Sequence, residues 1–394
     1  MDFSLTEDQQ DIRDAVLKHC SRFPDDYWLE CDRGGVFPND FHRSMAESGW
    51  LGVAMPAAVG GAGLGITEAA IMMQAVAESG GGMTAASSIH GPVFSMQPVT
   101  LFGTESQQQR MIPPVLSGEH LMCFAVTEPD AGTNSFAMRT RAQRLDDGRY
   151  VLNGQKAFIS GADEADHMLV IARTAPAGER VGRDHGFSLF IIDCDTPGIE
   201  LARMDIEWHA PERQFEVFFS DVEVPPHALI GDEGKGFRYL FDSLNGERIL
   251  IAAWAAGLGR FALGKAVNYA RHRAPFGSPI GGYQAVQHPL ARAHSHLEAA
   301  RLMIRAASAE YDGGADAGAK ANIAKLLASE AAGEALDVAV QVHGGHAFVA
   351  ETDIATLWPM VRTMRTGPIN NESILNYIGQ HVLGLPRSFE VTAP

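Results

Sequence analysis

The spacing of hydrophobic residues changes twice along the chain. Up to residue 120 the apolar positions recur every three or four residues, which is typical of amphipathic helices. Between residues 121 and 232, Val, Ile, Phe and Tyr alternate with polar residues, and the helical spacing returns from 233 to 394. The pattern predicts an α+β multidomain protein. Its parts are an N-terminal α-helical domain (1–120), a central antiparallel β-barrel or sandwich (121–232) and a C-terminal four-helix bundle (233–394).

Local signals refine these elements. Thr6 precedes two acidic residues and is the expected N-cap of the first helix. Residues 237–271 are apolar on nearly every side, which predicts a long buried helix. The apolar faces of the C-terminal bundle are in excess, which predicts an oligomer. Asp147-Gly148 and Asn153-Gly154 are predicted as hairpin turns. Strands are predicted at 138–145, 149–159, 167–174, 186–193, 198–203 and 214–224.

Composition narrows the functional class. The net charge of −17 argues against nucleic acid or an anionic membrane as a partner. The four cysteines are scattered, which is typical of reduced thiols. The start of the chain has no secretory or transit signal, and no apolar run is judged long enough to span a bilayer. We therefore expect a cytoplasmic protein. The chain has no H-E-x-x-H motif, and no metal site is expected.

The loop Ala125–Asn134 is the strongest candidate for binding a cofactor. Its sequence, AVTEPDAGTN, combines the helix breakers Pro129 and Gly132 with short polar side chains, including those of Thr127 and Thr133. Such a loop brings backbone N–H groups close to a polar heterocycle or a pyrophosphate. The chain has neither a G-x-G-x-x-G fingerprint after a strand nor a P-loop, so the site is of another design.

Three charged residues each allow two interpretations. Glu247 lies in an apolar helix, where it is either a general base with a raised pKa or the partner of a nearby Arg; composition alone favours the ion pair. Glu128 is either catalytic or bonded to local backbone. Arg273 either binds a phosphate or is solvated.

Taken together, these segments resemble the acyl-CoA dehydrogenase family nearly end to end. The loop Ala125–Asn134 is similar to the family's flavin loop, and Asn153–Ser160 to the motif that faces the flavin. Arg273–Gly277 resembles the segment that reaches a neighbouring subunit's FAD. The resemblance implies bound FAD, a homotetramer and an electron-transfer flavoprotein as acceptor. It also implies these cofactor contacts: Phe124, Val126, Thr127, Gly132, Thr133, Phe158, Ser160, Arg273, Phe276, Gln284, Gln341, Gly344, Gly345, Asn370 and Glu372.

The resemblance also locates the catalytic base. Pro368 stands where most of the family carries the catalytic Glu, whereas Leu244–Arg248 matches the Leu-x-x-Glu-Arg motif of a branch similar to isovaleryl-CoA and long-chain dehydrogenases. This implies Glu247 as the base, with Asn245, Arg248 and Thr133 at the substrate. Proline has no N–H to hold the thioester carbonyl, so that donor comes from elsewhere, or from Gly367 or Ile369.

The activity implied by the resemblance is α,β-dehydrogenation of an acyl-CoA thioester. A carboxylate removes the α-proton while the β-hydrogen leaves as hydride to flavin N5. Two alternatives stay open on the same scaffold. One is a flavin monooxygenase or oxidase, which needs no such base. The other is a non-catalytic partner subunit of a hetero-oligomeric dehydrogenase.

Overall fold

The computed structural model describes residues 4–175, 185–207 and 212–386. The chain forms two compact units, each built from separate stretches of sequence. We call the first the helical unit; it comprises Met1–Asp25, Ile66–Ala86 and Asn245–Pro394. We call the second the sheet unit; it comprises Asp26–Gly65 and Ser87–Leu244.

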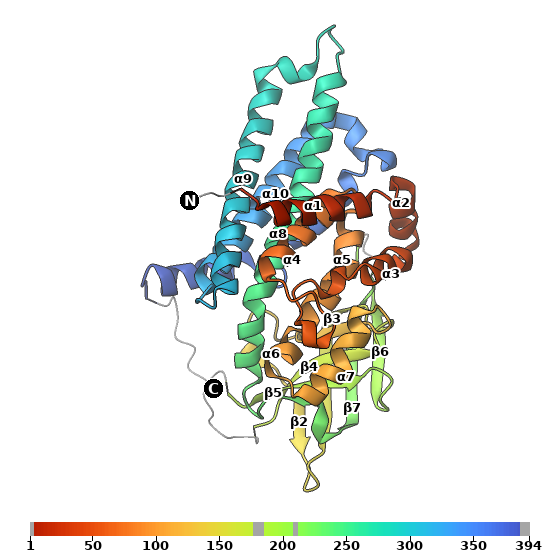
Figure 1. The fold of residues 1–394 in the computed structure, drawn as a ribbon, viewed down its shortest axis with the longest axis vertical. Helices are drawn as coiled ribbons and strands as arrows, with labels where there is room; N and C mark the ends of the chain where they lie inside the picture. The colour runs from red at the N-terminus through yellow and green to blue at the C-terminus, as the bar shows by residue number, and fades with distance from the viewer. Residues whose placement is uncertain (1–3, 176–184, 208–211, 387–394) are drawn as a thin grey trace. The chain divides into compact units, whose positions relative to one another are not determined.

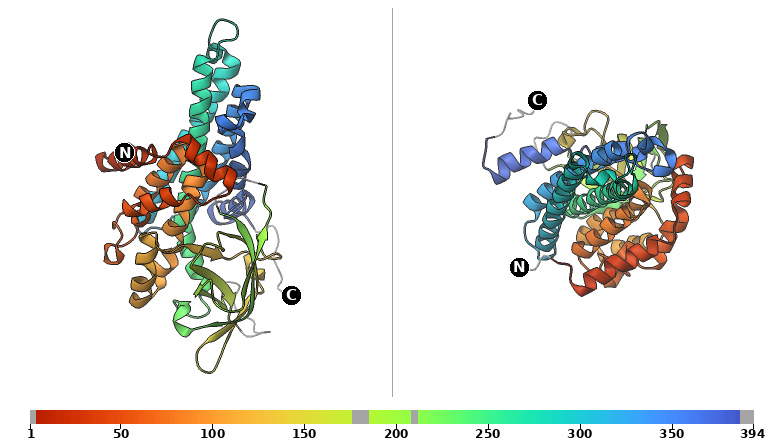
Figure 2. Two further views of the ribbon diagram at one scale, coloured as in Figure 1. Left: turned by 90° about the vertical axis from the view of Figure 1, so that its right-hand side faces the viewer. Right: turned by 90° about the horizontal axis from the view of Figure 1, so that it is seen from above.

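Long helices dominate the helical unit. At Gly259 of α8, an added Cβ would lie 2.8 Å from Leu297 of α9 and 2.9 Å from the Ala332 backbone of α10, so only glycine allows this close approach. The three long helices run side by side (Figure 1) and are seen nearly end-on from above (Figure 2). The helices of this unit are α1 (Glu7–Cys20), α4 (Ile66–Glu78), most of α8 (Gly236–His272), α9 (Gln284–Asp312), α10 (Gly318–His343), α11 (Trp358–Thr363) and α12 (Asn371–Tyr377).

Two features of this unit test the sequence-based predictions. The predicted cap of α1 is confirmed, because Thr6 and Gln9 form a reciprocal capping box. The predicted C-terminal helices are confirmed: three long helices are followed by the short α11 and by α12, which begins at Asn371 where a shorter helix was expected. The break between α11 and α12 contains Gly367 and Pro368, which are poor helix formers.

Helix α8 corrects one expectation. It is long and apolar enough to cross a membrane by length and composition, contrary to the sequence-based judgement that no run qualifies. Within the structure, however, 78% of its most apolar stretch is buried by protein, so burial in a core accounts for its composition.

The sheet unit combines one eight-stranded sheet with shorter helices. The helices are α2 (Asp25–Gly34), α3 (Asn39–Glu47), most of α5 (Gly82–Ser95), α6 (Gln97–Phe102) and α7 (Glu105–Leu116). The strands are β1 (Met122–Ala125), β2 (Arg141–Arg144), β3 (Tyr150–Ser160), β4 (His167–Arg173), β5 (Phe187–Asp193), β6 (Ile199–Met204), β7 (Gln214–Val224) and β8 (Leu229–Ile230).

The strand order is β6-β7-β3-β2-β4-β5-β8, with β1 paired to β4. The six predicted strands are confirmed to within a few residues, whereas β1 and β8 were missed because they are too short to show alternation. Most pairings are antiparallel, but β1 runs parallel to β4, so the sheet is mixed rather than purely antiparallel. Inward-facing side chains such as Leu152, Val170 and Phe190 form its core.

One of the two predicted hairpin turns is wrong. Asp147-Gly148 does turn the chain between β2 and β3, with Gly148 at φ 88°. Asn153-Gly154 instead lies within β3, at a register shift against β7. A Cβ on Gly154 would lie 2.6 Å from the Thr140 Cα, so this glycine permits close backbone approach and not a turn.

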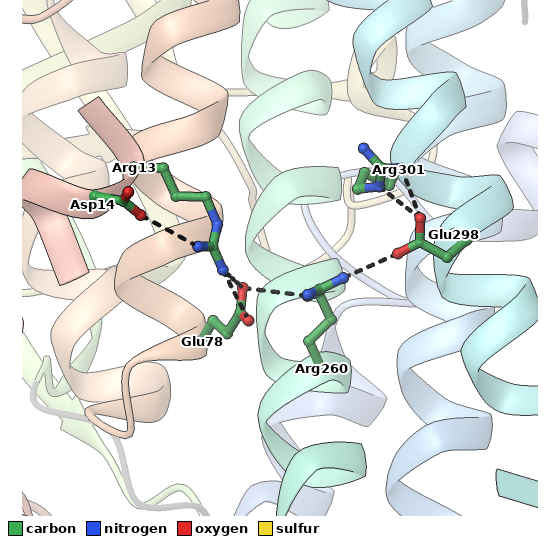
Figure 3. A network of polar contacts seen from close by, with 6 residues as sticks. All are labelled: Arg13, Asp14, Glu78, Arg260, Glu298 and Arg301. Carbon is green, nitrogen blue, oxygen red and sulfur yellow. Dashed lines mark hydrogen bonds and ion pairs between the residues drawn. The ribbon is translucent and has the colours of Figure 1, made fainter. Parts of the chain in front are cut away.

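A network of ion pairs ties four helices of the helical unit together (Figure 3). Glu78 of α4 accepts from Arg13 of α1 at 3.2 Å and from Arg260 of α8 at 3.2 Å. Arg260 also contacts Glu298 of α9 at 3.0 Å, and Glu298 in turn pairs with Arg301 at 2.6 Å. Because these side chains are less than a third exposed, the network is screened less than an ordinary surface pair.

We expect Glu78→Gln to destabilise the helical unit, because it leaves two arginines without their shared carboxylate. The expected cost is about 1–3 kcal/mol, seen as a lower thermal midpoint. Asp14→Asn is the matched control, because Asp14 is 62% exposed and lies 3.8 Å from Arg13. Its expected effect is below about 0.5 kcal/mol. Equal midpoints for the two variants would contradict a structural role for the network.

Candidate functional site

The loop Ala125–Asn134 of the sheet unit leaves β1 and is fastened to β3. The Ala157 N–H donates to the Thr127 carbonyl at 2.9 Å, and Glu128 forms an isolated antiparallel bridge with Ala131. Thr127 is half-buried, and Gly132 and Thr133 are exposed. An added Cβ on Gly132 would meet nothing within 4 Å, so the backbone is open to an approaching ligand there.

A buried ion pair between Lys156 and Glu128 stabilises this loop. Lys156 is 0% exposed and Glu128 is 6% exposed, and the Lys156 Nζ donates to Glu128 Oε1 at 3.0 Å and to the Val126 carbonyl at 2.9 Å. Glu128 also accepts from the backbone N–H groups of Arg139 at 2.6 Å and Thr140 at 3.0 Å. The carboxylate is therefore engaged in local bonds, which is the structural and not the catalytic interpretation of Glu128.

The pKa values of the pair follow from burial and charge. Burial acts to raise the pKa of Glu128, but Lys156 and the hydrogen-bond donors outweigh it, so this pKa is lowered. Burial lowers the pKa of Lys156 to about 8, and Glu128 acts against that shift. Each charge thus depends on the other to stay ionised inside the sheet unit.

Beside the loop, β3 turns an aromatic ring outward. The register of β3 against β7 shifts between Lys156 and Ile159, and Phe158 within that bulge has φ 59°. A left-handed backbone at a bulky residue costs about 1–3 kcal/mol and clusters at functional sites. The Phe158 ring is 56% exposed, although a large apolar side chain gains from burial.

The hydroxyl of Ser160 is the second polar group of this surface. Ser160 is exposed and accepts a hydrogen bond from the Gln214 side chain at 2.8 Å. Phe124 and Val126, which lead into the loop, are half-buried. An exposed ring, hydroxyls and open backbone next to one another fit a planar heterocycle with polar edges, so these residues suit the isoalloxazine of FAD.

Glu247 lies on α8, just after the point at Asn245 where this helix enters the helical unit. It is only 5% exposed. Burial raises its pKa to about 8, while the positive charges of Arg248 and Lys325 act to lower it. A carboxyl group with a pKa near neutrality is suited to taking up a proton.

Arg248 is itself buried, at 8% exposure, and its Nη1 donates to Asn245 Oδ1 at 2.7 Å. Burial lowers the pKa of Arg248, and Glu247 acts against that shift. Within this short segment of α8, Asn245 and Arg248 are thus joined by a hydrogen bond next to the buried Glu247.

The turn between α11 and α12 contains Pro368, after a cis peptide bond with Gly367. The Gly367 N–H donates to the Thr363 carbonyl at 2.9 Å, so it is already used within the turn. The Ile369 N–H makes no hydrogen bond within the described part of the chain. Of the two donors considered from the sequence, Ile369 is the one with a usable N–H.

The start of α12 carries two further residues named from the sequence. The Asn370 side chain accepts from the Ser373 N–H at 2.7 Å and so caps α12, while Glu372 is exposed in its first turn.

The remaining predicted cofactor residues form a separate exposed group at the far end of α8. There the Tyr269 and His343 rings lie 4.4 Å apart, which joins the end of α8 to the end of α10. Tyr269 is 22 residues beyond Glu247, or about 33 Å along the helix. Glu247 and the residues at the far end of α8 therefore cannot contact the same flavin ring within one chain. The exposed residues near this end are Arg273, Phe276, Gln284, Gln341, Gly344 and Gly345.

Sequence reasoning missed two buried lysines, Lys156 and Lys325. Both stand in apolar runs, in Gln155-Lys-Ala-Phe-Ile159 and in Ile323-Ala-Lys-Leu-Leu327. Lysine is almost never fully buried unless it is paired, so a lone lysine in such a run is a usable signal for an internal partner.

Comparison with known proteins covers nearly the whole chain. Residues 6–119, 123–222 and 234–383 match the N-terminal, middle and C-terminal domains of acyl-CoA dehydrogenase. "Acyl-CoA dehydrogenase fadE12" of Mycobacterium bovis is 39% identical over 98% of this chain and 99% of that protein. Butyryl-CoA dehydrogenase of Megasphaera elsdenii has a similar structure, with TM-score 0.91, 30% identity, and 97% and 100% coverage. The FAD complex of PigA also has TM-score 0.91, with 28% identity and coverage of 98% and 100%.

We expect Glu128→Gln to lower stability by about 3–5 kcal/mol, because it leaves the Lys156 charge buried without its partner. The thermal midpoint and the amount of flavin retained after gel filtration measure the effect. Glu223→Gln, a change at a 63% exposed carboxylate on β7, is the control. The double variant Glu128→Gln/Lys156→Met removes both charges and should recover part of the loss. A single variant as stable as the parent would contradict this account of the loop.

Proposed function

Since the chain belongs to the acyl-CoA dehydrogenase family, we propose that it is an FAD-dependent acyl-CoA dehydrogenase in which Glu247 is the base. The observation that carries the assignment is the buried carboxyl of Glu247, with its pKa raised to about 8, within a Leu-x-x-Glu-Arg segment. A proline at position 368, where most of the family has its Glu, supports the same assignment.

Proton abstraction is the step that the helical unit performs. The α C–H of a thioester is a weak acid, and a solvated carboxylate is a poor base for it. Burial makes the Glu247 carboxylate more basic, because an ion with few water contacts gains more from accepting a proton. When bound, FAD supplies the acceptor for the β-hydrogen, which leaves as hydride.

The negative charge that develops on the thioester oxygen needs donors in place before the reaction. The Ile369 N–H takes this role in our proposal, since Pro368 has no N–H and that of Gly367 is used within the turn. Arg248, kept in place by Asn245, supplies a fixed positive charge next to the base.

In the sheet unit we assign the flavin surface to the loop and the bulge of β3. Thr127 and Ser160 supply polar contacts to the flavin edge, and Phe158 packs on its ring. Buried Lys156 and Glu128 hold the loop in place beneath them. The further contacts proposed here are Phe124, Val126, Gly132 and Thr133, with Thr133 also meeting the thioester.

The assembly proposed is a cytoplasmic homotetramer that passes electrons to an electron-transfer flavoprotein. The group at the far end of α8 lies about 33 Å along that helix from Glu247, which supports its use at the FAD of a neighbouring subunit. Asn370 and Glu372 remain proposed flavin contacts. The division of the chain into 1–120, 121–232 and 233–394 belongs to the same proposal.

Anaerobic mixing with acyl-CoAs tests the reaction. We expect bleaching of the flavin by some members of a panel of short, long and branched acyl-CoAs. Glu247→Gln should keep its FAD and lose at least about 100-fold in kcat, the usual contribution of a general base. Turnover by that variant at the parent rate would remove Glu247 as the base. Bleaching by NAD(P)H and by none of the acyl-CoAs would favour the monooxygenase.

Subunit sharing of the cofactor site makes a second prediction. Arg273→Ala should weaken FAD retention by about 10- to 100-fold, the value of one charge-assisted hydrogen bond, without changing the mass of the assembly. Arg271→Ala, an exposed arginine two residues earlier, is the control. Sedimentation should give about four chains for the parent and both variants. A monomer that retains FAD with parental affinity would contradict the shared site.

A further inference from the structure

Lys325 is a fully buried lysine in the middle of α10 that the proposed mechanism does not use. Its side chain has 0% exposure. The Nζ donates to the Ile369 carbonyl at 2.6 Å and to Asn371 Oδ1 at 3.0 Å. Both acceptors lie in or next to the turn that carries Pro368, 44 and 46 residues further along the chain.

Asn371 is itself held by α10. Its side-chain amide donates to Ser329 Oγ at 3.1 Å, and Ser329 lies one helical turn after Lys325. The Asn371 N–H closes the turn by donating to the Arg365 carbonyl at 3.0 Å. Lys325 and Ser329, on two successive turns of α10, therefore both form hydrogen bonds with the segment from Ile369 to Asn371. The contact from Lys325 is the charged one.

The same ammonium acts on Glu247 through its charge. The positive charges of Arg248, on the same helix, and of Lys325, on α10, both act to lower the pKa of the Glu247 carboxyl. Around Lys325 stand Glu372 of α12, Arg365 of the turn, and Arg248 and Glu247 of α8. Tyr377 of α12 acts on Arg248 in turn. Lys325 thus contacts the turn and also acts on the base.

We infer that Lys325 is a positioning residue for proton abstraction: it fixes the turn that presents the Ile369 N–H and supplies, from α10, a positive charge that favours the carboxylate form of Glu247. The inference rests on the proposed function, because it takes Glu247 as the base and Ile369 as a donor. Lys325 touches neither proton nor thioester and acts through these two residues.

The charge of Lys325 determines the direction in which the pKa of Glu247 moves. A nearby cation stabilises the carboxylate, so it lowers the pKa of Glu247 below the value that burial alone would give. Removing the cation therefore raises this pKa. Since the base must be ionised, kcat/KM rises with pH up to that pKa, and the rising limb moves to higher pH when Lys325 is lost.

Three variants of the holoenzyme test the inference. Lys325→Met removes the charge and the donor and keeps an apolar stem of similar length. Lys325→Arg keeps a permanent charge. Ser329→Ala removes one hydrogen bond to Asn371 and leaves the charge.

The pH profiles of the three variants should differ. For Lys325→Met we expect the rising limb of kcat/KM to move up from about 8, and its plateau at high pH to stay below the parental value because the turn that presents the Ile369 N–H has lost its charged contact. Activity at pH 7 should fall about tenfold for every pH unit by which the limb moves. Lys325→Arg should keep the limb at or below its parental position, and Ser329→Ala should leave it unchanged.

A second measurement does not depend on turnover. Infrared difference spectra against pH follow the C=O stretch of the protonated Glu247 carboxyl, which Glu247→Gln identifies by its loss. This band should persist to higher pH in Lys325→Met than in the parent. An unmoved band together with an unmoved limb would overturn the inference and leave Lys325 a structural residue.

The two failures are distinguishable. If Glu247→Gln turns over at the parental rate, the proposed function fails, whatever Lys325→Met does. If Glu247→Gln is inactive while the limb and the band of Lys325→Met stay at their parental positions, Glu247 remains the base and only the role of Lys325 is overturned.

Discussion

The cost of keeping charge out of water organises both units of this protein. An ionised side chain in the interior is tolerated only when other charges and hydrogen bonds compensate for lost hydration. In the sheet unit, Lys156 and Glu128 satisfy one another and, through Val126, hold the loop Ala125–Asn134. In the helical unit Glu247 is compensated less completely, and its pKa stays near 8. One principle therefore gives a rigid support in one place and, in our proposal, a proton acceptor in the other.

The difference between these carboxylates lies in their hydrogen bonds. Glu128 accepts from two backbone N–H groups and an ammonium, all of which favour the charged form. Glu247 is influenced by two cations, yet burial still dominates its pKa. Neither outcome can be read from composition, since both residues are glutamates beside a proline or a glycine. The choice between structural and catalytic roles needs the three-dimensional partners.

Much of the fold was predictable from the sequence, because periodicity reports burial directly. The long helices and six of the eight strands follow from it. The short strands β1 and β8 and the parallel pairing of β1 with β4 depend on contacts distant in sequence, which periodicity does not encode. Asn153-Gly154 misled for a related reason. Gly154 is required because the backbone of Thr140, which precedes β2, packs too closely for a Cβ; it does not form a local turn.

The site was only partly predictable. The motifs singled out Glu247 and the loop Ala125–Asn134 as candidates, and Pro368 at the usual position of the Glu pointed in the same direction; their roles stay predictions. Lys156 and Lys325 were not found, because a lysine in an apolar run does not indicate which distant residue compensates its charge. Their partners, Glu128 and the Ile369–Asn371 segment, lie 28 and 44 to 46 residues away in sequence.

Phe158 has a consequence for the life of the newly folded chain. Its left-handed backbone and its half-exposed ring are both unfavourable, and only the second is relieved when a planar ligand covers the ring. Without such a ligand the Phe158 ring stays exposed to water at the bulge of β3. If the flavin packs on Phe158 as proposed, loading of the cofactor would therefore also bury an apolar ring that the flavin-free chain leaves in water.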